Sequence, residues 1–525
     1  MSTQHPLSGE STDDQSEELG RAIALLERFV HEPDSWVRVL PEDRERLLIA
    51  AGRLSRPSPD EKRRRARAFR KKDRNETRTR DEALLSTAAL RKQKDLSAFL
   101  PPAVHPLVGL LPGDGNPAES TTAEPASESN EERLEEPRAC YVCKAPYDRV
   151  HFFYHSMCAA CAALNYQKRS QAAPMDGRVA LVTGARIKIG FHTALKLLRA
   201  GARVIVTTRF PVDAARRFAA EDDAETWQSR LEIHGLDLRH TPSVERFAAS
   251  LLARLDRLDV LINNAAQTVR RPPAFYDHLI AAERLPLAEL PRETRLLLGA
   301  VTGSPEAALA APDANRTIEI AEEALHRFTS AESALVPWAG EIAEDPALFP
   351  EGQFDGDAQQ VDLRPVNSWR LGLADVPTPE LLEVHLVNAI APFLLASRLK
   401  PLMQKTPGPK HVIHVSAMEA SFSRKKKTIN HPHTNMAKAA LNMMTRTSAA
   451  DYQRDGIYMN SVDTGWVTDE DPLHHAVRKQ RDYDFHAPLD SVDGAARVLD
   501  PLFAGLIAGE HPWGLFFKDY RPVDW

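Results

Sequence analysis

A phosphate-binding turn is the first chemically informative feature of this 525-residue sequence. Within residues 178–190, an apolar, β-branched run over 179–182 breaks at Thr183-Gly184 and is followed by an amphipathic segment over 191–200. A strand, a glycine-containing turn and a helix N-terminus present backbone N–H groups and the positive end of the helix dipole to an anion. The pattern predicts a phosphate cradle after a buried parallel strand. A tight strand-to-helix turn without a ligand is the alternative.

All four cysteines of the chain form a second chemical pattern, Cys140-x-x-Cys143 and Cys158-x-x-Cys161. Each pair can form a tight knuckle that presents two thiolates to one ion, and two knuckles complete a tetrahedral zinc site. The aromatic, β-prone residues 148–155 fit a hairpin between the pairs. Because all four ligands are cysteines, the predicted zinc is structural. Two redox-active pairs and free thiols are the alternatives.

Further motifs follow in a characteristic order: Leu236-Asp237-Leu238, Leu261-Ile-Asn-Asn-Ala-Ala266, Asn388, Ser416 and Lys438. With the glycine turn, they resemble the short-chain dehydrogenase/reductase superfamily over about residues 177–270 and 378–525. The resemblance implies an α/β fold with a Rossmann-type doubly wound parallel sheet. It also implies NAD(P)(H)-dependent hydride transfer between nicotinamide and a carbonyl or alcohol substrate.

The resemblance further implies where the dinucleotide binds. The matching positions are Thr183, Gly184, Arg186, Lys188, Ile189, Gly190, Arg209, Asp237, Leu238, Asn264, Ala265, Lys438, Thr464, Gly465 and Val467. Two of them depart from the family pattern, because Lys188 replaces a glycine and Thr464 replaces a proline. Lys188 either brings an ammonium close to the pyrophosphate or projects into solvent.

The residue after the second expected strand, over 202–209, predicts the choice of dinucleotide. An acid there accepts from the ribose 2′-OH of NAD, whereas an arginine suits the 2′-phosphate of NADP. The chain supplies Arg209 and no acid. NADP(H) is therefore favoured over NAD(H), with stacking of Arg209 on adenine as the alternative.

The catalytic positions implied by the resemblance contain one major departure. Asn388 matches the asparagine that holds a relay water, Ser416 the serine that holds the substrate oxygen, and Lys438 the lysine that contacts the ribose. Thr434 stands where the family has its catalytic tyrosine, and an aliphatic hydroxyl is too weak an acid for that role. The candidate substitutes are Thr434 with a water, or a histidine among His414, His431 and His433. A dinucleotide-binding regulator or scaffold without catalysis is the second hypothesis. A nucleic-acid-associated protein that uses the basic helix and the zinc module is the third.

Length and composition divide the chain into parts. Residues 1–100 are expected to be helical and charged, and 101–137 to form a flexible linker rich in Pro, Glu, Ser and Thr. The zinc module covers 138–172, and the Rossmann domain covers 175–525 with an insertion at about 275–375. A long insertion in a loop of an α/β fold often forms a lid or a partner surface, and a solvated acidic appendage is the alternative.

Charge and hydropathy restrict the classes of partner. The net charge of −6 favours neither nucleic acid nor membranes, and the basic segment 61–74 is interpreted as a solvated helix rather than a nucleic-acid contact. The sequence shows no secretory signal and no uninterrupted apolar run of the roughly 20 residues needed to span a bilayer. We expect a cytoplasmic protein with a small-molecule substrate, which the basic loop Arg424–Lys427 would favour as an anion. The insertion and the N-terminal region are candidate surfaces for a homo-oligomer or a protein partner.

Overall fold

The part of the chain that the computed structural model describes comprises residues 12–96, 132–299, 330–332, 345–355, 357–405, 408–424, 427–483 and 485–525. Contacts divide it into two compact units, Met1–Arg80 and Asp81–Trp525. Most of the expected linker and the segment 317–328, which reads as a helix in the sequence, lie outside the described residues.

The first unit is helical, as expected for the N-terminal region. Its helices are α1 (Thr12–His31), α2 (Pro33–Val37), α3 (Pro41–Ser55) and α4 (Pro59–Ser86), the last of which continues into the second unit. Phe29 packs edge-to-face on Trp36 with ring centroids 5.1 Å apart. A proline begins each of α2, α3 and α4, where its fixed φ suits the first helical turn and its missing N–H costs nothing.

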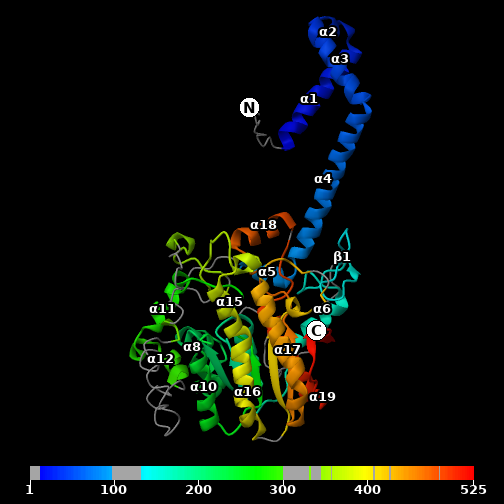
Figure 1. The fold of residues 1–525 in the computed structure, drawn as a ribbon. Helices are drawn as coiled ribbons and strands as arrows, with labels where there is room; N and C mark the ends of the chain where they lie inside the picture. Colours follow the sequence, from blue (N-terminus) through cyan, green and yellow to red (C-terminus); the bar gives the residue numbers. More distant parts are fainter. Residues whose placement is uncertain are drawn as a thin grey trace. The chain divides into compact units, whose positions relative to one another are not determined.

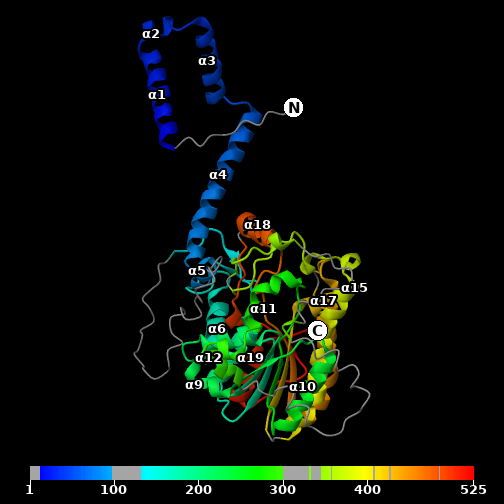
Figure 2. The same ribbon diagram turned by 90° about the vertical axis from the view of Figure 1, so that its left-hand side faces the viewer.

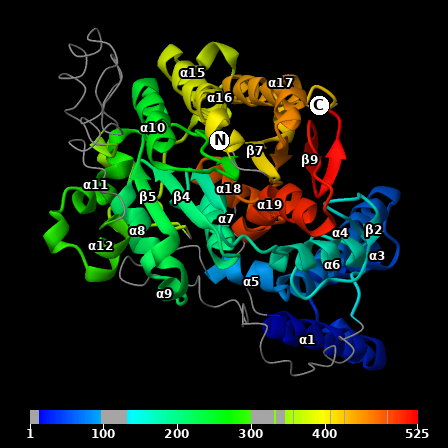
Figure 3. The same ribbon diagram turned by 90° about the horizontal axis from the view of Figure 1, so that it is seen from below.

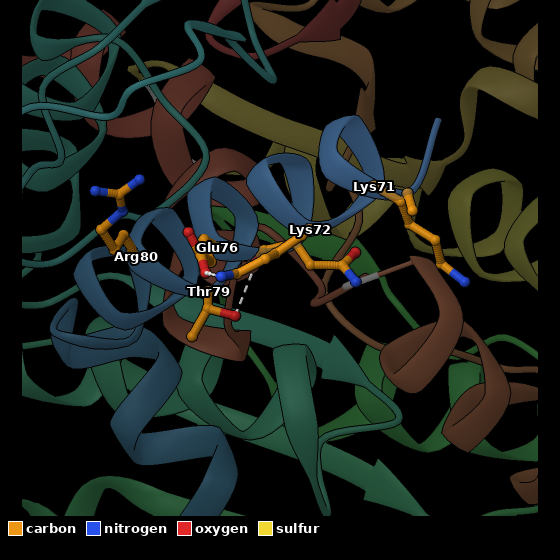
Figure 4. Close-up of a pocket in the computed structure, with 7 residues that line it drawn as sticks. Lys71, Lys72, Glu76, Thr79 and Arg80 are labelled. Carbon is orange, nitrogen blue, oxygen red and sulfur yellow. Dashed lines mark hydrogen bonds and ion pairs between the residues drawn. The ribbon is translucent and has the colours of Figure 1, made fainter. Parts of the chain in front are cut away.

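Helix α4 carries the basic segment as an exposed charged helix. Figure 4 shows Lys72 and Glu76 side by side on it, and their charged groups lie 3.6 Å apart at the i, i+4 spacing. Thr79 Oγ1 donates to Asn75 O at 2.9 Å. Pairs of this kind form on the solvated surface of a helix. Whether this segment contacts a partner stays a prediction.

The second unit is built around an eight-stranded sheet with the order β10-β9-β8-β7-β6-β3-β4-β5. Only the pairing of β10 with β9 is antiparallel. The strand bounds are β3 Val179–Thr183, β4 Arg203–Thr208, β5 Leu231–Gly235, β6 Val260–Asn263, β7 Lys410–Ser416, β8 Ile457–Asp463, β9 Phe516–Lys518 and β10 Arg521–Val523. Strand order reverses beside β3, as in a doubly wound sheet. The predicted fold class is therefore confirmed.

Helices cover both faces of this sheet (Figures 1, 2 and 3). One core lies between the strands and the helices α7 (Lys188–Arg199), α8 (Pro211–Ala219) and α19 (Ser491–Ala508). The other core lies between the strands and the helices α10 (Thr241–Arg254), α16 (Ala391–Gln404) and α17 (Pro432–Arg454). Every residue of β3 and β7 is buried. Because β3 is covered on both faces, its residues form a continuous apolar run instead of an alternating one.

One continuous helical segment, Thr378–Gln404, is long and apolar enough to cross a membrane by length and composition. It comprises α15 (Thr378–His385), the π-helical turn η8 (Leu386–Ile390) and α16. Half of its most apolar window is buried, and α16 contributes Leu395, Leu399 and Leu402 to the core of the fold. Its apolar character is accounted for by packing against the sheet and α10.

Apart from residues 330–332, the described residues of the insertion form two parts with different positions. Its first part, α11 (Asp277–Glu283) and α12 (Arg292–Gly299), packs against α8 beside the sheet edge. Its second part, within 345–375, forms short turns and supplies Asp355, Gln359 and Trp369 to the wall of a cleft. The insertion therefore both covers the sheet edge and borders the cleft.

The four-cysteine module is small and docks on α19. It has two short strands, β1 (Arg138–Ala139) and β2 (Pro146–Tyr147), and one helix, α6 (Ala159–Ser170). The charged atoms of Arg169 lie 2.7 Å from Asp490 and 3.0 Å from Asp493 on the N-terminal side of α19. These ion pairs, and a shared apolar cluster, fix the module to the Rossmann domain.

Candidate functional site

A cleft of about 1170 Å³ lies at the carboxyl ends of the parallel strands. Six successive strand ends contribute to its wall, through Gly184 after β3, Arg209 after β4, Asp237 after β5, Asn264 after β6, Ser416 of β7 and Asp463 of β8. Ligands of open α/β sheets bind at this edge, where the strand order reverses. The topology therefore brings residues far apart in sequence to one site.

The turn between β3 and α7 requires its two glycines. Gly184 has φ +68°, and a Cβ there would lie 2.7 Å from Ala265 Cα. A Cβ on Gly190 would lie 2.3 Å from the Gly184 carbonyl oxygen. Helix α7 starts without a side-chain cap, because Ile187 occupies the N-cap position. Its first N–H groups therefore face the cleft in the arrangement that binds an anion.

The segment after β6 is fastened to the same turn. Asn264 Nδ2 donates to the carbonyl oxygens of Thr183 and Gly184, both at 3.0 Å. Thr183 Oγ1 accepts from the backbone N–H groups of Asn264 and Ala265, both at 3.1 Å. The two strand ends that flank the reversal of strand order are thus locked together.

Lys188 faces acidic groups instead of projecting freely into solvent. It begins α7 with a left-handed φ of +53°, and its Nζ lies 3.7 Å from Asp357 and 3.8 Å from Glu470. Burial alone would lower its pKa, but Glu470 and Asp357 raise it above the ordinary lysine value. The insertion therefore contributes a carboxylate to the turn where a phosphate would be held.

Two arginines lie near this turn. Arg186 is buried, and its guanidinium donates to Asp213 at 2.7 Å and to Gln359 at 2.8 Å. Arg209 donates to the Tyr276 hydroxyl at 2.8 Å and stacks over that ring at 4.9 Å. Tyr276 belongs to the start of the insertion, so the insertion also orients the arginine that the sequence identified.

Asp237 has an intramolecular partner. Its carboxylate accepts from the Arg239 backbone N–H at 2.9 Å and from the Arg239 guanidinium at 2.6 Å. Arg239 also donates to Glu383 at 3.0 Å. The adjacent Leu238 lines the cleft. The dinucleotide contact expected of Asp237 stays a prediction, and it would have to coexist with the ion pair to Arg239.

Lys438 and Ser416 reach the cleft together. Lys438 Nζ donates to the Val415 carbonyl oxygen at 2.6 Å, and burial lowers the pKa of this lysine to about 8. The Ser416 hydroxyl at the end of β7 is buried, and it has no hydrogen-bond partner among the residues that the structure describes. A serine hydroxyl and a lysine ammonium are thus both available to a ligand in the cleft.

Thr434 is buried one turn before Lys438, and it is not among the residues that line the cleft. Of the three candidate histidines, His431 is the one that lines the cleft. It caps α17 with φ +43°, stacks on Trp369 at 3.8 Å, and its Nδ1 lies 3.1 Å from Asn435 Oδ1. Burial lowers the pKa of His431. His431 is therefore the best placed of the sequence-derived substitutes for the missing tyrosine.

Asn388 is fully buried in the π-helical turn η8. Its Oδ1 accepts from the Gln267 N–H at 2.7 Å, and its Nδ2 donates to the Gln267 carbonyl at 3.0 Å. The side chain thus fixes the segment that follows Asn264. A π-turn shifts the hydrogen-bonding pattern of a helix and is frequent at functional sites. The relay-water role of Asn388 stays a prediction.

The loop after β8 completes the wall, with Thr464, Gly465 and Val467 all lining the cleft. Tyr141, which comes from the four-cysteine module, also lines it. No sequence pattern indicated Tyr141, because its position in the cleft depends on a contact with Trp466, more than 300 residues further along the chain.

The four cysteines converge as their spacing predicts. Their Sγ atoms lie within 4.8 Å of one another, and no disulfide joins them. The Sγ atoms of Cys143 and Cys158 are 3.7 Å apart, close to the edge of about 3.8 Å expected for a tetrahedron with zinc–sulfur bonds of about 2.3 Å. Burial raises the pKa of the Cys140 thiol, but backbone hydrogen bonds overcome this effect and lower it to about 7. The donor set fits a thiolate-binding metal.

Comparisons with known proteins agree with this geometry. The family model described as short chain dehydrogenase matches residues 178–279, and the model described as Enoyl-(Acyl carrier protein) reductase matches residues 367–488. An uncharacterized protein of Acanthamoeba polyphaga mimivirus is 30% identical over 384 residues, which cover 70% of this chain and 71% of that protein. The chain belongs to the short-chain dehydrogenase/reductase superfamily. The resemblance inferred from the sequence is therefore confirmed.

Other proteins are similar to a smaller share of the chain or have lower sequence identity. Retinol dehydrogenase 11 of Mus musculus is 43% identical over 91 residues, which are 17% of this chain and 28% of that enzyme. Among solved structures, the Pseudomonas aeruginosa RhlG/NADP active-site complex is 18% identical, with 67% of this chain and 96% of that chain covered and a TM-score of 0.39. A 7α-hydroxysteroid dehydrogenase complexed with NADH and 7-oxo glycochenodeoxycholic acid is 16% identical, with the same coverage and TM-score.

Proposed function

We propose that this protein is an NADP(H)-dependent oxidoreductase that transfers hydride between the nicotinamide and a carbonyl or alcohol substrate. One arrangement carries the proposal, namely that Ser416 and Lys438 face the same cleft as the uncapped start of α7. The Ser416 hydroxyl suits a substrate oxygen, and the Lys438 ammonium suits a ribose. The first N–H groups of α7 suit a pyrophosphate. The Gly184–Gly190 turn and the first N–H groups of α7, which have no side-chain cap, support this proposal.

The residues of the chain would divide the chemistry among them. The bound dinucleotide would supply or accept the hydride. The Ser416 hydroxyl would donate a hydrogen bond to the substrate carbonyl oxygen and so stabilise the negative charge that develops there. The Lys438 ammonium would hold the ribose hydroxyls. His431, or a water reached through it, would deliver the proton that the family takes from a tyrosine.

A second function is favoured by the position of Thr434. Its hydroxyl is buried, is absent from the wall of the cleft, and has no hydrogen-bond partner among the described residues. A protein that binds the dinucleotide without turnover, as a regulator or scaffold, would not need a proton donor at this position.

A turnover screen separates the two functions. Purified protein is incubated with NADPH and a panel of aldehydes, ketones and anionic oxo acids, while oxidation of NADPH is followed by absorbance. The anionic members of the panel test whether Arg424 and Lys427, both of which line the cleft, favour a negatively charged substrate. Substrate-dependent oxidation that His431→Phe reduces at least tenfold supports the oxidoreductase. Saturable NADPH binding with no oxidation across the panel supports the regulator.

The choice of NADP(H) is tested at Arg209. Replacing Arg209 with Asp removes a cation and places a carboxylate beside the expected 2′-phosphate, so NADPH affinity should fall by about 10- to 100-fold, as for loss of a hydrogen bond to a charged group. NADH affinity should change much less. Equilibrium titration of both dinucleotides measures the change, with Arg446→Asp on the exposed side of α17 as the control. Wild-type protein that prefers NADH would contradict the role given to Arg209.

The acidic contact of the insertion should oppose dinucleotide binding. Asp357 is paired with Lys188, and a pyrophosphate at the start of α7 would compete for the same ammonium. Because both side chains are partly exposed, Asp357→Asn should strengthen NADPH binding only about two- to fivefold. Calorimetric titration checks this, with Glu351→Gln in the same insertion as a matched control that has an exposed carboxylate. Unchanged or weaker binding in Asp357→Asn would show that the two anions do not share Lys188.

A further inference from the structure

The first cysteine knuckle places a tyrosine in the wall of the cleft. Tyr141 lies between Cys140 and Cys143, and both Tyr141 and Lys144 line the cleft. Tyr141 is therefore at once part of the loop that presents two thiolates and part of the surface that would meet a ligand. No other region of the module has this double position among the described residues that line the cleft.

The Tyr141 hydroxyl contacts the loop that follows β8. Its oxygen accepts a hydrogen bond from the Trp466 backbone N–H at 2.9 Å. The preceding Gly465 has φ +77°, and a Cβ there would lie 3.1 Å from the Tyr141 oxygen and 2.5 Å from Leu489 Cδ1. Because Thr464, Gly465, Trp466 and Val467 all line the cleft, this contact holds part of the cleft wall in place.

The same loop is tied to the catalytic side by Asp463. Its carboxylate accepts from the Gly465 N–H at 2.9 Å and from the Met418 N–H at 2.7 Å, and Met418 follows Ser416 by two residues. Lys518 Nζ donates to Asp463 at 3.1 Å and lies 5.8 Å from the Tyr141 ring. The loop is thus held from the sheet by Asp463 and from the module by Tyr141.

The module has little secondary structure with which to hold Tyr141. Its sheet contains only two residue pairs, and the knuckle is supported by the Tyr141 N–H to Ser156 carbonyl bond at 2.8 Å and the Cys140 N–H to Ala145 carbonyl bond at 2.9 Å. Small modules of this kind obtain much of their stability from a bound metal. Metal at the four cysteines would therefore decide how firmly Tyr141 is held.

We propose that Tyr141 is a positioning residue of the cleft, and that a metal bound by Cys140, Cys143, Cys158 and Cys161 keeps it against the Gly465–Val467 loop. The module then acts as a structural part of the ligand site instead of an independent appendage. The proposal rests on the proposed function only for the identity of the ligand, since the contact with the loop exists without one.

Hydrogen–deuterium exchange of the peptide covering 464–469 tests the contact without any dinucleotide. Tyr141→Phe keeps the ring and removes the oxygen that accepts from Trp466, so exchange at this amide should accelerate at least fivefold. Removing the metal from wild-type protein with a chelator should accelerate it similarly. Metal-free Tyr141→Phe should be no faster than either single change, because all three lose the same bond. Tyr166→Phe in α6, which also keeps its ring, is the matched control and should exchange like wild type.

NADPH titration of the same proteins gives the second readout. Tyr141→Phe and metal-free wild type should each bind NADPH about three- to tenfold more weakly than metal-replete wild type, whereas Tyr166→Phe should not. Unchanged exchange and unchanged affinity in Tyr141→Phe would overturn the inference. If exchange responds as expected but wild type binds no dinucleotide, the proposed function fails and the coupling between module and loop stands.

Discussion

Replacing Lys438 with alanine should weaken NADPH binding by about 10- to 100-fold, as expected when a charged hydrogen-bond donor is lost from a buried site. Where turnover is measurable, it should fall by about a hundredfold or more, because the lysine also orients the reacting ring. Lys438→Met is the companion variant, since it fills most of the lysine volume and separates loss of the ammonium from loss of packing. Both titrations are made beside a thermal melt, because the Val415 carbonyl loses its partner in each variant.

The pH dependence identifies the group responsible. Burial lowers the pKa of Lys438 to about 8, so the side chain is largely an ammonium at pH 7 and largely a neutral amine at pH 9. The NADPH affinity of wild type should therefore decrease between these pH values by more than that of Lys438→Met. Equal affinity of wild type and Lys438→Ala would show that the alignment of Thr434 and Lys438 with the family motif is mistaken.

Loss of the metal should destabilise the module and its contact with the Rossmann domain. We propose one structural zinc per chain, measurable by elemental analysis of purified protein. Cys143→Ser should abolish it and lower the melting temperature by about 5–15 °C, since structural zinc contributes about 10 kcal/mol to the folding of small modules while part of this module is also held by its docking on α19.

Cys143 is the most informative cysteine because its side chain is exposed, so its replacement removes a ligand with little change in packing. Cys143→His is the matched variant, because imidazole is also a zinc ligand, and it should retain metal and most of the stability. Wild-type protein that contains no metal as purified and has four freely titrating thiols would contradict a zinc site. So would a melting temperature that does not change when a chelator is added.

Local patterns predicted the parts of the site that local geometry determines. The turn from Gly184 to Gly190 has the expected glycine contacts, because a strand, a tight turn and a helix impose them within a few residues. The cysteines converge because each knuckle is a local structure. The positions of Ser416 and Lys438 in one cleft follow from the order of strands in a doubly wound sheet.

The missed features all depend on long-range contacts. Spacing along the chain could not show that Asp357 reaches Lys188 or that Tyr276 orients Arg209, since both partners lie in the insertion. Thr434 sits on α17 one turn from Lys438 as expected, but it does not line the cleft. His431, the N-cap residue of that helix with φ +43°, lines it instead. These contacts arise when distant segments of the chain pack together. No repeating pattern in the sequence indicates which distant segments will do so.

The most direct test of the proposed function is an equilibrium titration of metal-replete wild-type protein with NADPH and NADH, monitored by dinucleotide fluorescence. We expect saturable binding of one NADPH per chain in the micromolar range, equivalent to about −8 kcal/mol. We also expect tighter binding of NADPH than of NADH, and weaker NADPH binding in Lys438→Met. The absence of saturable binding of either dinucleotide at concentrations up to about 1 mM, equivalent to about −4 kcal/mol, would contradict the proposed function.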